Sequence, residues 1–248
     1  MKREFFMTKR MTALEPISKS VQCGFCGKLF EYKLYPEITI PGDHKLKKQV
    51  LNKTLFFPRC PYCKQQIKVK PECIYRNKTK NEIFVVTDTL IDHFEDMLIT
   101  GDILFSDIAS DEDIEKLVIG MYKRRIVRDI DSFREKILLS DNNYDDRIFE
   151  LMKLSLSRLI ERKTHSKVYR IFLDDTSGHN LLFTAITGER PPFEYISINS
   201  NPGVYVKYRK KYLDRLGLPN EDEYIFTDQN WAKESGLLED DDESLIEM

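Results

Sequence analysis

The sequence has no long hydrophobic stretch. None of its apolar runs comes near the ~18 residues that a membrane-spanning helix needs. A secretory signal needs an apolar core of about 7–15 residues, and the N-terminus has none, because Lys9 and Arg10 closely follow Phe5 and Phe6. With 41% hydrophobic and 32% charged residues over 248 positions, the composition is typical of a globular chain of one or two domains. We therefore expect a cytoplasmic protein with no membrane partner.

Several motifs that mark enzymes are also missing. The sequence contains no P-loop, no Gly-x-Gly-x-x-Gly, no His-Glu-x-x-His and no Gly-x-Ser-x-Gly. Histidine, a frequent acid or base in catalysis, occurs only four times. The sequence therefore offers no motif for a nucleotide-dependent enzyme, a zinc protease or a serine hydrolase.

Charge is unevenly distributed along the chain, although the net charge is only −2. Residues 1–80 contain 18 Lys and Arg against 6 Asp and Glu, whereas the remainder contains 21 basic and 35 acidic residues. A basic segment of this kind contacts a polyanion such as nucleic acid, pairs with the acidic part of its own chain, or forms a plain solvated surface. The counts alone do not distinguish these interpretations.

Cysteine is the most informative residue type. Four of the five cysteines form two Cys-x-x-Cys pairs, Cys23–Cys26 and Cys60–Cys63, with 33 residues between them. Cytosolic thiols stay reduced, so paired cysteines indicate a metal first, and four thiolates complete the tetrahedral shell of a structural Zn²⁺. Gly27 suits the turn after the first pair because it accepts φ > 0, which is less favourable for Lys64 after the second pair. His44 is predicted to be a surface residue, since four thiolates already fill the shell.

The second pair has an alternative interpretation. Cys-Pro-Tyr-Cys is also the active-site tetrapeptide of glutaredoxins, where the first cysteine opens a helix that lowers its thiol pKa. Here residues 64–70 alternate in polarity and then meet Pro71, which predicts a strand instead of a helix. Zinc is therefore the preferred interpretation, and thiol redox chemistry is the lesser one. Cys73 has no partner in the pattern and is predicted to be a small buried residue in a strand.

The spacing of apolar residues around the cysteines predicts mostly strands. The expected elements are strands over 30–40 with a break at Pro36, over 55–57, around 67–69 and over 82–86, with a short helix over 46–55. Each cysteine pair should therefore lie between strands, with a helical insert between the two halves. The pattern predicts a zinc-ribbon-like part.

The remainder of the chain predicts helices followed by a small antiparallel sheet. Helical periodicity covers 89–99, 110–121, 131–138, 145–162 and 203–216, and strand-like segments cover 168–173, 181–186 and 193–198. We therefore expect an α+β chain of five parts. These are an N-terminal extension of doubtful order (1–20), the zinc-ribbon-like part (21–88), a helical region (89–163), a C-terminal α+β part (164–238) and an acidic tail (239–248).

The cysteine pattern resembles the CpXC-domain proteins. The likeness rests on Cys23-Gly-Phe-Cys-Gly27, on residues 46–55, and on Cys60-Pro-Tyr-Cys63. It continues in 125–137 and in Asp145-Asp-Arg-Ile-Phe-Glu-Leu-Met-Lys153, and so covers about residues 20–163. Gly24 and Lys64 depart from the expected Pro and Gly. The resemblance implies a fold and a metal, not an activity.

Two classes of function remain open. The first is a zinc-stabilised binding module that contacts nucleic acid or a protein through a basic surface. Its candidate contacts are Lys28, Lys33, Lys45, Lys47, Lys48, Arg59, Lys64, Lys68 and Lys70. The second is an enzyme with its site in the C-terminal part, which would need a pocket joining Asp174, Asp175 and His179 to Asp145 or Asp146. The spacing of Asp145, Asp146 and Glu150 also suits the first turns of a helix, where negative charge meets the helix dipole.

Overall fold

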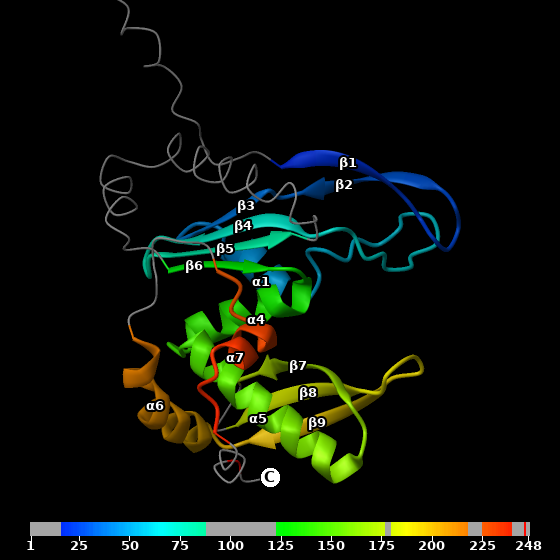
Figure 1. The fold of residues 1–248 in the computed structure, drawn as a ribbon. Helices are drawn as coiled ribbons and strands as arrows, with labels where there is room; N and C mark the ends of the chain where they lie inside the picture. The colour runs from blue at the N-terminus through cyan, green and yellow to red at the C-terminus, as the bar shows by residue number, and fades with distance from the viewer. Residues whose placement is uncertain (1–15, 88–122, 177–179, 218–224, 240–245, 247–248) are drawn as a thin grey trace, which may run out of the picture. The chain divides into compact units, whose positions relative to one another are not determined.

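The computed structural model describes residues 16–87, 123–176, 180–217, 225–239 and 246. Within them lie nine strands in three sheets and five helices, so the chain has the mixed α+β architecture that the sequence predicts (Figure 1). The chain divides into two compact units, which are treated separately below. Unit 1 comprises residues 1–129 and 220–224, and unit 2 comprises 130–219 and 225–248. The helices predicted over 89–99 and 110–121 lie outside the described residues.

Unit 1 contains two sheets. The first is an antiparallel hairpin of β1 (Ile17–Gln22) and β2 (Leu29–Leu34), paired from Ile17 with Leu34 to Gln22 with Leu29. The second sheet has the order β3-β4-β5-β6. Its strands are β3 (Glu37–Ile40), β4 (Glu72–Asn77), β5 (Glu82–Thr87) and β6 (Lys123–Val127). The outer pairs β3–β4 and β5–β6 are parallel and the central pair is antiparallel.

Burial in the larger sheet follows from strand position. Every residue of β5 is buried, as expected for a Val- and Ile-rich strand enclosed on both faces. Tyr75 of β4 stacks on Phe84 of β5 with 5.7 Å between ring centroids. Cys73 lies in β4 as predicted and is buried, and burial raises the pKa of its thiol. The larger sheet of unit 1 therefore has its own apolar core.

The segment between the cysteine pairs differs in part from the prediction. Helix α1 (His44–Leu51) begins two residues earlier and ends four residues sooner than expected, and its buried residue is Val50. The strands predicted over 55–57 and around 67–69 are both wrong: a turn lies at residues 55–56, and residues 67–69 form no regular strand. Ile67 and Val69 still donate backbone hydrogen bonds to the carbonyls of Pro58 and Phe56, at 3.0 and 3.1 Å. Pro58 has no N–H and cannot donate a hydrogen bond in return, so the pairing between residues 56–58 and 67–69 is incomplete.

Unit 2 packs helices against an antiparallel sheet of order β7-β8-β9 (Figure 1). Its strands are β7 (Val168–Asp175), β8 (Leu181–Thr187) and β9 (Glu194–Ser200). Its helices are α4 (Ile130–Asp141), α5 (Asp146–Thr164), α6 (Pro202–Leu216) and α7 (Gln229–Glu234). Burial alternates strictly along β8, so one face of this central strand supplies Leu181, Phe183 and Ala185 to the core.

Helix α5 is the centre of the unit 2 core. Asp145 caps its N-terminus by accepting a hydrogen bond from the Arg147 amide, and His165 ends it in the left-handed conformation. The aromatic ring of Phe149 contacts Phe183 of β8 and Tyr205 of α6, with centroids 6.1 and 5.3 Å apart. Val204, Tyr205, Tyr208 and Tyr212 form the buried face of α6.

Candidate metal centre

The first cysteine pair occupies the turn between β1 and β2. The Gly27 amide donates to the Cys23 carbonyl at 2.8 Å, and the Cys23 amide donates to the Lys28 carbonyl at 2.9 Å. Gly27 has φ +72, a conformation that glycine adopts without steric cost. These contacts form a tight knuckle that turns both sulfurs of the pair to the same side.

The second pair repeats this geometry. The Lys64 amide donates to the Cys60 carbonyl at 2.9 Å, and the Cys60 amide donates to the Gln65 carbonyl at 2.9 Å. Lys64 has φ +63, so it stands where Gly27 stands in the first knuckle, in a conformation that disfavours a side chain. The turn predicted from the sequence is therefore present at both pairs, including the less favourable position.

The two knuckles bring all four sulfurs together. The Sγ atoms of Cys23, Cys26, Cys60 and Cys63 lie within 4.8 Å of one another. Cys23 and Cys63 are 3.5 Å apart at sulfur, and Cys26 and Cys60 are 3.7 Å apart. A tetrahedral site with Zn–S bonds of about 2.3 Å separates its sulfurs by about 3.8 Å. The four cysteines can therefore hold a metal ion.

The knuckle backbone stabilises negative charge on two of the sulfurs. Burial raises the pKa of the Cys60 thiol, but the amides of Cys63 and Tyr62 and nearby thiols donate to its sulfur, and the net effect lowers the pKa to about 6. In the same way, amides of Cys26 and Phe25 outweigh burial at Cys23 and lower its pKa. Thiolate is the form in which cysteine binds a metal.

Cys63 behaves in the opposite way. The Gln65 amide lowers the pKa of this thiol, but burial and the three neighbouring sulfurs raise it to about 12 overall. Four sulfurs this close cannot all be negative without a cation between them, because like charges repel strongly at such distances. The donor set therefore fits a divalent ion that accepts four thiolates.

The residues around the sulfurs form only a small apolar core. Cys23, Phe30 and Cys60 are buried, and Val21, Tyr32, Cys63 and Ile67 pack against them. Cys26 is exposed. His44 is exposed at the start of α1, as predicted, and is not part of the cysteine cluster.

A family model for the CpXC protein matches residues 21–153. The chain belongs to the CpXC family. The resemblance inferred from the two cysteine pairs is therefore confirmed, and the matched region of this CpXC protein runs from the first knuckle into helix α5. No curated protein and no solved structure matches the chain. Among the described helices of the CpXC protein, none is long and apolar enough to cross a membrane.

The predicted basic contacts of this CpXC protein are spread over three elements of unit 1. Lys28 and Lys33 belong to the first hairpin, Lys45, Lys47 and Lys48 to α1, and Arg59, Lys64, Lys68 and Lys70 to the second knuckle and the chain after it. All are exposed except Lys47, which is half-buried. A cavity of about 250 Å³ is lined by Lys68, Val69, Lys70, Pro71, Arg128 and Asp129. That these residues contact a partner stays a prediction.

The residues proposed for an enzyme site have structural contacts in unit 2. Asp145 caps α5 and pairs with the Arg147 guanidinium at 2.8 Å. Asp146 is buried and accepts from Lys136 Nζ at 3.0 Å. Asp174 accepts a hydrogen bond from the Thr184 hydroxyl, and Asp175 accepts from the amide of Thr176. His179 lies outside the described residues, and the pocket that the enzyme hypothesis needs stays a prediction.

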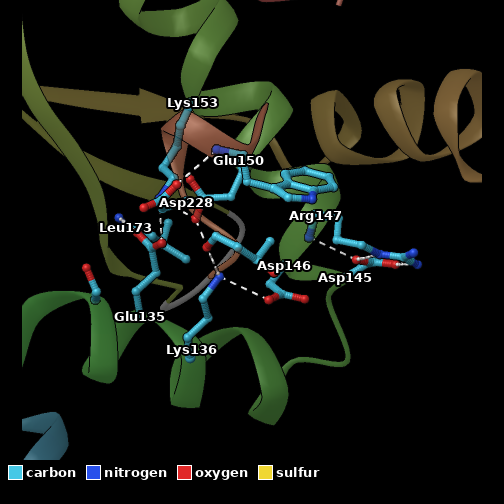
Figure 2. Close-up of polar contacts among 12 residues, drawn as sticks. Glu135, Lys136, Asp145, Asp146, Arg147, Glu150, Lys153, Leu173 and Asp228 are labelled. Atoms are coloured by element: carbon cyan, nitrogen blue, oxygen red, sulfur yellow. Dashed lines mark hydrogen bonds and ion pairs between the residues drawn. The ribbon is translucent and has the colours of Figure 1, made fainter. Parts of the chain in front are cut away.

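Unit 2 also contains a buried charge cluster that the sequence did not reveal (Figure 2). We define it as Glu135, Lys136, Asp146, Glu150 and Lys153, all with side-chain exposure of 6% or less. Lys153 contacts Glu135 at 2.6 Å and Glu150 at 2.9 Å, and Lys136 contacts Glu150 at 3.5 Å and the Thr227 carbonyl at 2.7 Å. The other Glu135 oxygen accepts from the Leu173 amide at 2.6 Å. The cluster thus joins α4, α5, β7 and the segment before α7.

The cluster holds three carboxylates and two ammonium groups. Burial raises the pKa of Glu150, opposed by Lys153 and Lys136 and reinforced by Glu135. Burial lowers the pKa of Lys153, but Glu135 and Glu150 more than reverse this effect and raise it. The sequence offered two signals, the spacing of Asp146 and Glu150 at the start of a helix and the i, i+3 spacing of Glu150 and Lys153, and both are also common on exposed helix faces.

Proposed function

We propose that this CpXC protein is a binding module whose N-terminal part is stabilised by structural Zn²⁺ and contacts an anionic partner through its basic surface. The observation that carries the metal assignment is the set of four sulfurs within 4.8 Å, presented by two knuckles of the same design. Four thiolates at tetrahedral spacing are a preferred ligand set of zinc. Four protein ligands leave no open position for substrate, so the ion supports the fold and does not act as a catalyst.

The hairpin around the first knuckle supplies the physical reason for a structural metal. Phe30 and Leu34 are the only fully buried residues of β1 and β2. An isolated two-stranded hairpin is marginally stable in water, and the small cluster beneath it buries little apolar surface. Metal binding by residues that are scattered in the unfolded chain supplies folding free energy directly.

The metal assignment is tested by the zinc content of the purified protein. We expect one Zn²⁺ per chain, and we expect Cys60→Ser to abolish stoichiometric binding because it removes a ligand. The matched control is Cys73→Ser, which changes a buried cysteine of the same unit outside the cluster. Equal zinc content in Cys60→Ser and the unchanged protein would overturn the assignment. A redox-active protein would instead stay folded without zinc and lose only thiol exchange.

The anionic partner is tested with heparin, a polyanion that carries no bases. We expect zinc-loaded protein to bind heparin with an affinity that falls steeply between about 50 and 200 mM salt, as counterion release requires. Charge reversal at the exposed Lys33 and Lys68 should weaken binding at least tenfold. Reversal at the exposed Lys167 and Lys210 of unit 2 is the matched control and should change little. Absence of binding at 50 mM salt, or equal losses in both pairs, would contradict the proposal.

A further inference from the structure

Each knuckle exposes an aromatic ring at the same position. Phe25 precedes Cys26 and Tyr62 precedes Cys63, so both rings stand directly before the second cysteine of their pair. Phe25 is 69% exposed and Tyr62 is 56% exposed. Phe30 and Ile67 pack inward around the sulfurs, whereas Leu29, beside the first knuckle, is 63% exposed. The structure of the cluster does not need these two rings, since neither packs in its core.

The two rings belong to one continuous surface. Both adjoin sulfurs that lie within 4.8 Å of each other. Lys28, which follows the first knuckle, places its Nζ 4.7 Å from the centroid of the Tyr62 ring on the second knuckle. This cation–π contact crosses from one knuckle to the other, so the outer sides of the two turns adjoin.

The surface around the rings is strongly basic. Residues 22–35 and 57–70, which contain both knuckles, carry six Lys and Arg and a single acidic residue. That residue, Glu31, accepts a hydrogen bond from the Ser18 hydroxyl at 3.1 Å. Lys33, Arg59 and Lys68 are exposed. Exposed aromatic faces among positive charges are the combination that binds unpaired nucleotides, whose bases stack and whose phosphates are anionic.

We propose that the paired knuckles bind single-stranded nucleic acid, with unpaired bases stacked on Phe25 and Tyr62 and phosphates contacting Lys28 and the neighbouring basic side chains. This inference rests on the proposed function and names its partner class. A duplex keeps both faces of its bases covered by stacking, so the rings distinguish single strands from duplexes. Stacking uses the π face that every base has, so binding tolerates many sequences.

The experiment measures fluorescence anisotropy of a labelled 12-nucleotide single-stranded RNA with the zinc-loaded full chain, beside a duplex of equal length. Phe25→Leu and Tyr62→Leu remove the flat ring and keep an apolar side chain. We expect each to weaken single-strand binding by about 5- to 150-fold, the range for loss of one stacked base. The control Tyr195→Leu changes a 70% exposed ring on β9 of unit 2 and should leave binding unchanged. Zinc content, measured on each variant, should stay at one ion per chain.

Charge is read separately through salt dependence. Lys28→Ala should lower the slope of log K against log salt by about 0.7, the contribution of one phosphate contact in a single strand. Equal binding of duplex and single strand, or unchanged affinity in both ring variants, overturns the inference and leaves salt-dependent heparin binding intact. If heparin binding is also absent while zinc is retained, both the inference and the anionic-partner proposal fail. Capture of an acidic protein with no single-strand binding overturns the inference alone.

Discussion

The two units concentrate ionisable groups in different ways. In unit 1, four thiols meet at one point, where they can hold a cation supplied from outside the chain. In unit 2, the buried charge cluster brings lysines to carboxylates and neutralises most of its charge from within. The apolar surroundings differ as well, because the knuckles sit on three buried residues and the cluster of unit 2 lies beside an extended hydrophobic core. Under the proposed function, the small core beneath the knuckles depends on an external ligand, whereas the large core of unit 2 holds its ion pairs without one.

Metal removal should separate the two units most sharply. With a strong chelator, we expect residues 17–34 and 59–67 to lose protection from hydrogen exchange, while α5 and β8 keep theirs. Structural zinc supplies about 10–16 kcal/mol in zinc-finger peptides, far more than the knuckle core can replace. Hydrogen exchange followed by mass spectrometry resolves the two sets of peptides. Uniform loss of protection in both units would show that the comparison is wrong.

Removal of one lysine should upset the charge balance of the buried charge cluster and destabilise unit 2. Lys153→Met leaves Glu135 and Glu150 buried without their nearest ammonium group. Breaking a buried ion pair in this way costs about 3–5 kcal/mol. Urea unfolding followed by the fluorescence of Trp231, the single tryptophan and a residue of α7, measures unit 2 directly. Lys163→Met, at the exposed end of the same helix, is the control and should cost little. A loss below about 1 kcal/mol would contradict the prediction.

The pH dependence of unit 2 follows from Glu150. Its pKa is raised in the folded protein, so between the ordinary value of 4.5 and the raised value the native state keeps a proton that the unfolded chain loses. The free energy of unfolding should therefore fall as pH rises through that interval, by up to about 1.4 kcal/mol per pH unit. Glu135, Lys136 and Lys153 face this carboxyl. In urea unfolding at several pH values, Glu150→Gln should remove the fall in the free energy of unfolding with pH. An unchanged slope in this variant would contradict the assignment to Glu150.

The smallest effect contrasts the two knuckles themselves. Gly27 and Lys64 share the left-handed conformation, with φ +72 and +63. Lys64→Gly should strengthen resistance to chelation by about 1 kcal/mol, reduced by loss of the Lys64 hydrogen bond to the Pro61 carbonyl. Gly27→Ala should weaken resistance to chelation by a similar amount. The cause would be backbone strain and not a steric clash, because nothing lies within 4 Å of an added Cβ. Competition with a chelator measures both, and changes of the same sign would disprove the equivalence of the knuckles.

The contrast between the knuckles and the buried charge cluster also explains which features the sequence could predict. The knuckles depend on residues two or three positions apart, so the cysteine pairs and the turn at Gly27 are visible without a structure. The cap of α5 is equally local, because Asp145 accepts from an amide two residues away. The failed strand over 55–57 shows the limit, since Pro58 interrupts a ladder that hydrophobicity alone suggested. Glu135, Lys136 and Glu150 were not predicted to be buried because their partners come from four separate segments.

The contact between Lys136 and the Thr227 carbonyl affects the order in which unit 2 can be completed. The two residues are 91 positions apart, and their 2.7 Å hydrogen bond is buried. On the ribosome, this ammonium group emerges long before its carbonyl acceptor has been synthesised. Until then it has only Asp146 and Glu150 to contact, and the side of α4 that will carry the segment before α7 stays open to water. Unit 2 can therefore be completed only after the segment before α7, which lies beyond the family-matched region, closes over the cluster.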